Sequence, residues 1–286
     1  MNRFRTISYS FQRSFTTGKV PPVSLQVHPS SKIATLTLQS SPVNALTSSV
    51  LLSLNEQLNH LQSLDIKGLI LCSRFPKIVS AGLDLNTLSK KENETRNEFH
   101  TRFSQYMSEF QTAASLLLQV RVPTIGIVRG ASPAGGCVLM LCCDYRIGSR
   151  TSSLSIGLNE VAVGMAPPPW IHALAEARLG KRIADRALQL GVIVNNKDGL
   201  RMGFIDELVD VEDKTEWDVL YAKACDEIEK YHLMPHNARV SAKSICNQSI
   251  LKHMNDDAIE YVANSVSGDE FQLVVKSIIA SLKSKK

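Results

Sequence analysis

Apolar and polar residues along this chain recur with two different periods. Ile33–Leu38 alternates apolar and polar positions, as in a half-buried strand, whereas Val50–Leu61 carries leucines at helical spacing. Gly68–Cys72 and Pro123–Val128 are short apolar runs of the type that is buried within a parallel sheet. Such alternation of strands and helices predicts an α/β fold with a parallel-type sheet wrapped by helices.

After Asp213 the spacing of apolar residues is almost entirely helical. No low-complexity tract or long linker separates this region from the α/β part, and the sequence shows no internal repeat. We therefore expect an α/β core over residues 23–210 and a helical region over residues 211–286. The expected C-terminal helices are Trp217–Tyr231, Asn237–Cys246, Asp256–Val266 and Glu270–Leu282.

The first 19 residues, MNRFRTISYSFQRSFTTGK, differ in composition from the rest of the chain. They are rich in Arg and Ser, contain no acidic residue and have no continuous apolar run. These features exclude a secretory signal peptide and are typical of a mitochondrial presequence, with a disordered basic tail as the alternative. We therefore expect a presequence and linker over residues 1–22 and a location in the mitochondrial matrix.

The 286-residue chain has an ordinary globular composition, 44% hydrophobic and 21% charged, and is long enough to bury a large core. No stretch approaches 18 consecutive apolar residues, so no membrane span is expected. The net charge of +5 comes from the N-terminal part, because the chain from Glu56 onward balances its charges and gives no support for nucleic-acid binding. The basic residues before Glu56 are Arg3, Arg5, Arg13, Lys19 and Lys32.

The six cysteines form no C-x-x-C pair and lack the spacing of a structural zinc site. We therefore expect all six to be reduced core residues, and we expect no metal site. Four of them lie in apolar stretches: Cys72, Cys137, Cys142 and Cys143.

Two glycine-containing turns follow expected strands. Ser80–Leu85 (SAGLDL) comes after Gly68–Cys72, and Gly130–Cys137 (GASPAGGC) lies between Thr124–Val128 and an apolar helix at Val138–Cys143. Small residues at such turns let a ligand approach the backbone, and N–H groups at a helix start are free. Each turn alone is also compatible with a structural bend, but two together can supply both N–H donors of an oxyanion hole. The nucleotide motifs G-x-G-x-x-G and G-x-x-x-x-G-K-[ST] are absent.

Glu160 is the one carboxylate in an otherwise apolar stretch, Ile156–Gly164 (IGLNEVAVG). Burying a charged side chain there is costly unless it is paired or protonated. Burial would raise its pKa, which suits a base that must later return its proton. The same spacing also fits a glutamate on a solvent-facing loop.

Four motifs, in this order, resemble those of the crotonase (enoyl-CoA hydratase/isomerase) superfamily, and the resemblance runs from about Val23 to the C-terminus. It implies a crotonase-like spiral of ββα units with a helical C-terminal trimerisation region, assembled as trimers or pairs of trimers. It also implies a fatty enoyl-CoA substrate and no cofactor, because coenzyme A is part of the substrate. The motifs are Asn44–Leu46, Ser80–Leu85, Gly130–Cys137 with Cys143–Asp144, and Leu158–Glu160.

The resemblance also implies roles for individual residues. Glu160 corresponds to a catalytic base, and the backbone N–H groups of Leu83 and Gly135 correspond to the donors of an oxyanion hole. Losing one such donor costs about 2.7–4 kcal/mol in known examples. The substrate-binding residues implied in this way are Ala81, Gly82, Leu83, Asp84, Leu85 and Gly135.

Hydratases of this superfamily carry two glutamates, but here Val138 occupies the first position and only Glu160 remains. One carboxylate suffices to take a proton from C2 and return it at C4. A double-bond shift is therefore a better interpretation than hydration. Within the superfamily the sequence most resembles the branch of mitochondrial Δ3,Δ2-enoyl-CoA isomerases, which implies a shift of a 3-cis or 3-trans double bond to 2-trans in β-oxidation of unsaturated fatty acids. The alternatives are a hydratase-like homologue and an inactive crotonase-fold binding or scaffold protein.

Overall fold

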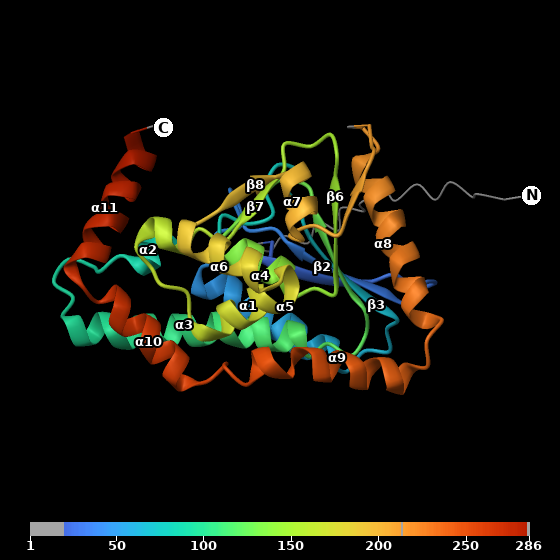
Figure 1. Ribbon diagram of the computed structural model, residues 1–286, viewed down its shortest axis with the longest axis horizontal. Helices are drawn as coiled ribbons and strands as arrows, with labels where there is room; N and C mark the ends of the chain where they lie inside the picture. Colours follow the sequence, from blue (N-terminus) through green and yellow to red (C-terminus); the bar gives the residue numbers. More distant parts are fainter. Residues whose placement is uncertain (1–19, 213, 285–286) are drawn as a thin grey trace, which may run out of the picture.

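A computed structural model of the chain describes residues 20–212 and 214–284 (Figure 1). The expected presequence, at residues 1–19, lies outside the described residues. A six-stranded sheet has the order β1-β2-β3-β4-β6-β9, in which β1 pairs antiparallel with β2 and the other neighbours are parallel. The strands are β1 (Val23–Val27), β2 (Ile33–Leu38), β3 (Gly68–Ser73), β4 (Thr124–Val128), β6 (Tyr145–Ser149) and β9 (Glu207–Val209).

A second, three-stranded sheet has the order β5-β7-β8. Its strands are short: β5 (Ala131–Pro133) and β7 (Ser155–Gly157) are parallel, and β8 (Ile193–Asn195) pairs antiparallel with β7. Because β5 leads into the second glycine turn and β7 ends shortly before Glu160, this small sheet brings that turn next to the glutamate segment.

Helices surround the large sheet. The helices in the described residues are α1 (Ser48–Leu61), α2 (Leu85–Leu88), α3 (Arg96–Leu118), α4 (Gly135–Leu141), α5 (Pro169–Leu179), α6 (Lys181–Leu190), α7 (Asn196–Met202), α8 (Glu216–His232), α9 (His236–Leu251), α10 (Asp256–Val266) and α11 (Asp269–Ser284), with a 3-10 turn η1 (Glu160–Val163).

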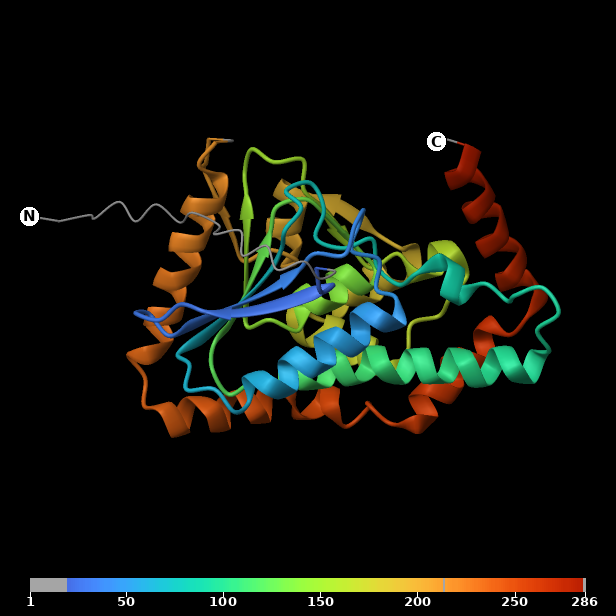
Figure 2. The same ribbon diagram turned by 180° about the vertical axis from the view of Figure 1, so that it is seen from behind.

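The sheet separates two apolar layers. On one face, α8 packs Leu220 and Ile228 against Ile70 and Ile125, and Gly68 lets Ile228 approach the backbone closely. On the opposite face lie α1, α3 and α4, which form the larger core together with α5 and α10 (Figure 2). Since both faces are covered, β3 and β4 are buried throughout, as their apolar sequences indicated. The expectation that Ile33–Leu38 is half-buried is wrong, because β2 is buried at every position except Thr35.

The C-terminal helices wrap around one side of this body. Figure 1 shows α9 and α10 running along its lower edge, after which α11 turns away at the far end. Lys243 on α9 ties this region to the end of β4 through a 2.7 Å ion pair with Asp144, which is itself bonded to Thr124. Gln272 on α11 accepts a 2.7 Å hydrogen bond from the Lys90 N–H.

Several expectations are met in this fold. The α/β architecture is confirmed, and the four expected C-terminal helices are present, although the sheet is mixed because β1 is antiparallel. The expectation that all six cysteines are core residues is wrong for Cys246, which is exposed on α9, and Cys225 is only partly buried. The division of the chain near residue 210 stays a prediction.

Candidate functional site

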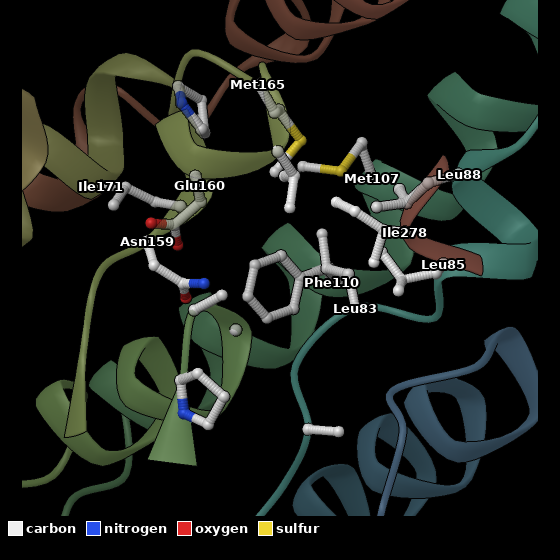
Figure 3. Close-up of a pocket in the computed structure, with 16 residues that line it drawn as sticks. Leu83, Leu85, Leu88, Met107, Phe110, Asn159, Glu160, Met165, Ile171 and Ile278 are labelled. Atoms are coloured by element: carbon white, nitrogen blue, oxygen red, sulfur yellow. The ribbon is translucent and has the colours of Figure 1, made fainter. Parts of the chain in front are cut away.

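A cavity of about 200 Å³ lies between α3, α5, η1 and α11 (Figure 3). Its walls are almost entirely apolar, with Met107 and Phe110 from α3, Ile171 from α5 and Ile278 from α11. Glu160 is the single ionisable side chain in this lining. The cavity therefore offers one proton-transfer group in surroundings that bind a hydrocarbon chain.

Glu160 is the first residue of η1 and is only 3% exposed, so it does not lie on a solvent-facing loop. Burial raises the pKa of its carboxyl from the ordinary 4.5 to about 7, although a hydrogen bond from its own backbone N–H opposes the rise. Its Oε2 atom has no hydrogen-bond partner within the described residues. Glu160 is therefore balanced between the ionised and protonated forms near neutral pH, as a proton shuttle requires.

The backbone around Glu160 is held on both sides. Gly157, at the end of β7, lies so close to β8 that a Cβ atom there would be 1.9 Å from the Val192 carbonyl oxygen. After the turn, the Met165 N–H donates to the Glu160 carbonyl at 3.1 Å, and Gly164 ends η1 in the left-handed conformation. The position of the carboxylate is therefore set by rigid backbone rather than by a loop.

The two glycine turns meet at the cavity. A Cβ atom at Gly135 would be 3.4 Å from the Leu83 nitrogen, and one at Gly82 would be 3.3 Å from the Gly135 nitrogen. Gly135 is the first residue of α4, so its N–H has no acceptor within the helix. The Leu83 N–H likewise donates to no acceptor among the described residues. Two free backbone donors thus lie next to each other at the mouth of the site, which is the arrangement of an oxyanion hole.

The first turn is supported by buried polar side chains. The Ser80 hydroxyl donates to the Asn44 carbonyl at 2.6 Å and accepts from the Gly82 N–H at 3.1 Å. The Asn44 amide in turn donates to the carbonyl oxygen of Val79 at 2.9 Å. The Tyr106 hydroxyl bonds both the Leu46 carbonyl and the Asp84 N–H. These contacts fix the residues on either side of the Leu83 donor.

The second turn contains a strained residue. Ala134 has φ 46° and ψ −121°, a conformation that side chains rarely adopt, and such strain costs about 1–3 kcal/mol. It is held because the Ala134 N–H donates to the Gly157 carbonyl at 2.8 Å. Gly136 also packs against the first turn, since a Cβ atom there would be 2.9 Å from the Ser80 carbonyl oxygen. The strained residue thus directly precedes Gly135, which lines the cavity.

A second cavity, of about 480 Å³, opens beside the first and shares Ala81, Leu83 and Leu85 with it. Asp84 lines this second cavity only, where α11 contributes further residues, including Ile279. Of the residues assigned by resemblance, Gly82 lines neither cavity: its φ of 83° shapes the turn. The remaining ones, Ala81, Leu83, Leu85, Gly135 and Glu160, all line the first cavity.

Some residues of the site were not identified from the sequence. Tyr106 lies on the same buried face of α3 as Phe103 and Phe110, and a hydroxyl within an aromatic stripe is a signal that could have been noticed. Ile278 lines the cavity from a helix more than a hundred residues after Glu160, and no local sequence pattern predicts that contact.

The part of the chain that the structure describes contains no cluster of three or more His, Cys, Asp or Glu side chains suited to a metal ion. Its helices, searched over the same residues, include none that is long and apolar enough to cross a membrane.

Comparison with known proteins decides the family. The enoyl-CoA hydratase/isomerase family matches residues 28–260 of this chain. The protein belongs to this family. The resemblance inferred from the four sequence motifs is thereby confirmed.

Relatives within the enoyl-CoA hydratase/isomerase family include the mouse protein "Enoyl-CoA delta isomerase 1, mitochondrial", which is 32% identical over 259 residues, covering 89% of this chain and 85% of the relative. The crystal structure of human mitochondrial delta3-delta2-enoyl-CoA isomerase has a TM-score of 0.83 at 27% identity and covers 93% of this chain and 99% of that one. An enoyl-CoA hydratase from Bacillus halodurans has a TM-score of 0.75 at 17% identity over 90% of this chain and 99% of that one, which shows the shared fold alone.

Proposed function

We propose that this enzyme of the enoyl-CoA hydratase/isomerase family is a Δ3,Δ2-enoyl-CoA isomerase, which converts 3-cis or 3-trans enoyl-CoA thioesters to the 2-trans isomers. The observation that carries the proposal is Glu160, a single buried carboxylate with a pKa of about 7 in an apolar cavity that two free backbone N–H groups adjoin. These groups match the needs of a proton shift along an acyl chain.

The reaction begins when the Glu160 carboxylate takes a proton from C2 of the 3-enoyl thioester. The electrons of the broken C–H bond form a dienolate, whose negative charge gathers on the thioester oxygen. The N–H groups of Leu83 and Gly135 bind that oxygen and stabilise the charge as it develops. Glu160 then gives the proton to C4, and the double bond is left between C2 and C3.

The same site is poorly equipped for hydration. Adding water across the double bond calls for one group to activate the water and another to protonate the carbon, and hydratases of the family use two glutamates. Val138, at the position of the other glutamate, is completely buried on α4, and the cavity lining holds no carboxylate besides Glu160. Isomerisation is the reaction that one carboxylate can complete.

The coenzyme A part of the substrate fits the second cavity, next to the Ala81–Leu85 turn. This cavity shares lining residues with the Glu160 cavity, and Lys283 in its lining offers a cation to a phosphate group. Because coenzyme A belongs to the substrate, the reaction needs no separate cofactor. We further propose a homotrimer built through the C-terminal helices, which analytical ultracentrifugation would test.

A role in β-oxidation of unsaturated fatty acids in the mitochondrial matrix is part of the proposal. Its support is the mitochondrial designation of the mouse relative and the basic, acid-free composition of residues 1–19. Replacing Arg3, Arg5 and Arg13 together by Glu is expected to leave the protein in the cytosol. Mitochondrial location of that variant in fractionated cells would argue against the presequence.

The direct test is an assay of the purified protein with 3-enoyl-CoA, in which ultraviolet absorption reports formation of the conjugated 2-trans thioester. We expect rapid isomerisation. The same protein with 2-trans-enoyl-CoA is expected to give little 3-hydroxyacyl-CoA. Faster hydration than isomerisation would establish the hydratase alternative, and binding of both thioesters without turnover would establish a binding or scaffold protein.

A further inference from the structure

Asn159 is the one other polar side chain in the Glu160 cavity, and the mechanism above gives it no task. It is the N-cap residue of η1, a position where an Asn side chain usually accepts a hydrogen bond from the following turn. Here the side chain makes no such bond. Figure 3 shows it extending into the cavity beside the Glu160 side chain. Its amide is thus available for an interaction other than helix capping.

Two buried oxygen atoms, on adjacent residues that both line this cavity, lack a hydrogen-bond partner. The Oδ1 atom of Asn159 and the Oε2 atom of Glu160 are both buried and both unpaired within the described residues. A buried acceptor without a donor is unfavourable. A single hydrogen between them would satisfy both atoms.

We propose that Asn159 is the positioning residue of the base: its side-chain carbonyl accepts a hydrogen bond from Glu160 after Glu160 has taken the proton from the substrate. The inference rests on the proposed function, because isomerisation is what places that proton on Glu160. The amide holds the protonated carboxyl in place while the dienolate exists. Since an amide has no basic oxygen at neutral pH, the proton stays on Glu160 and is returned to C4.

No charged side chain accounts for the raised pKa of Glu160, which comes from burial. No ionisable side chain besides Glu160 lines the cavity. Cys137 on α4 is the ionisable neighbour that couples electrostatically to Glu160, and its own thiol pKa is raised well above 9.0 by burial, so it stays neutral. The charged side chains of α6 and α11, the helices that pack against η1, lie outside the lining.

The pair can be tested without any turnover. The ¹³C-carboxyl resonance of Glu160, assigned with Glu160→Gln, is titrated against pH in the wild-type protein and in Asn159→Leu. Leucine has a similar shape but no acceptor, so the protonated form of Glu160 loses its partner and the pKa of Glu160 falls. We expect a fall of about half a unit to one unit, the effect of one net hydrogen bond.

A matched control is Ile171→Val, which alters packing in the same cavity without removing a polar atom. It is expected to leave the pKa of Glu160 unchanged. An unchanged or higher pKa of Glu160 in Asn159→Leu would overturn the proposal. The Asn159 amide would then either have no effect on the protonated form of Glu160 or stabilise the ionised form instead.

The kinetic readout is the pH profile of isomerisation. In Asn159→Leu, kcat is expected to fall about threefold to tenfold with KM nearly unchanged, and the acid limb of the profile moves to lower pH. If Asn159→Leu does not fold, Asn159→Asp keeps an acceptor of the same shape and is expected to move the acid limb upward; an unmoved limb overturns the proposal. If the wild-type protein does not isomerise at all, the proposed function fails, whereas the titration still reports on the pair.

Discussion

The Tyr106 hydroxyl accepts a 2.9 Å hydrogen bond from the backbone N–H of Asp84. The same hydroxyl donates to the carbonyl oxygen of Leu46, so one buried side chain on α3 joins the first turn to the segment before α1. Asp84 directly follows Leu83, whose N–H group is the proposed donor to the thioester oxygen. Tyr106 therefore fixes the residue that follows the Leu83 donor, although Tyr106 itself does not line the cavity.

Tyr106→Phe tests this support. The substitution leaves the Leu46 carbonyl and the Asp84 N–H without their partner, which is expected to lower the free energy of unfolding by about 1–3 kcal/mol. Because the Leu83 donor is less well held, we expect kcat to fall about tenfold, less than the loss of a whole oxyanion donor. Tyr145→Phe, which removes a 3.3 Å bond to Glu207 at the far edge of the sheet, is the control and should retain kcat. Equal kcat values for the two variants would contradict this role.

Glu160→Gln tests the base. Gln has similar shape and polarity but no basic oxygen at neutral pH, so isomerisation of 3-enoyl-CoA is expected to fall by at least about 10²-fold. Binding of the thioester, measured by calorimetry, should be retained because the backbone donors and the second cavity are untouched. Turnover near the wild-type rate would rule out a mechanism with a single base.

The same substitution has an opposite effect on stability. The pKa of Glu160 is about 7 in the folded protein and near 4.5 when unfolded, so the folded form holds the proton more tightly. The wild-type protein therefore loses stability as pH rises from about 4.5 through 7, whereas the Glu160→Gln variant has no carboxyl to ionise at this position. Denaturant titrations should show the Glu160→Gln variant gaining up to about 3 kcal/mol relative to wild type between pH 4 and pH 8. A difference that does not change with pH would mean that the carboxylate is not desolvated.

Gly135→Val tests the meeting of the two turns. A Cβ atom at this position would be 3.0 Å from Leu46 Cδ1 and 3.4 Å from the Leu83 nitrogen, where the thioester oxygen must bind. We expect loss of thioester binding and of about 10²–10³ in kcat/KM, the range for a removed oxyanion donor. Gly268→Val is the control, because a Cβ atom there meets nothing within 4 Å. A folded Gly135→Val enzyme with full turnover would exclude this turn from the mechanism.

Gln272→Ala tests how α11 is held over both cavities. Gln272 is 7% exposed; its amide accepts from the Lys90 N–H and donates to the Leu88 and Val266 carbonyls. Without these bonds α11 should pack less firmly, so that the KM for long-chain 3-enoyl-CoA rises severalfold while Glu160 still titrates normally. Leu273→Ala, on the exposed side of the same helix, should change neither KM nor stability. A matching rise in KM for both variants would assign the effect to general disturbance of the helix.

Much of the fold could be predicted from the sequence because its longest elements have periodic patterns of apolar and polar residues. The strand at Ile33–Leu38 was predicted with the bounds that the structure has, and the helix at Asp256–Val266 likewise. The short strands β5, β7, β8 and β9 were not predicted, because three residues are too few to show a period. Helix α6 was not predicted either. Strand β8 is largely exposed, so burial does not give its sequence a clear pattern of apolar residues.

Part of the chemistry of the site could also be predicted from the sequence. The chain itself determines that one carboxylate stands in an apolar segment and that two turns carry small residues, since these are facts of composition and order. Only the tertiary structure decides that Glu160 is buried, because its desolvation comes from α3, α5 and α11, which are remote in sequence. The same holds for the bond between Tyr106 and Asp84 and for the approach of Gly135 to Leu83. The raised pKa of Glu160 and the pair of converging donors are properties of neighbours in space, and the sequence specifies them only through the packing that brings those neighbours together.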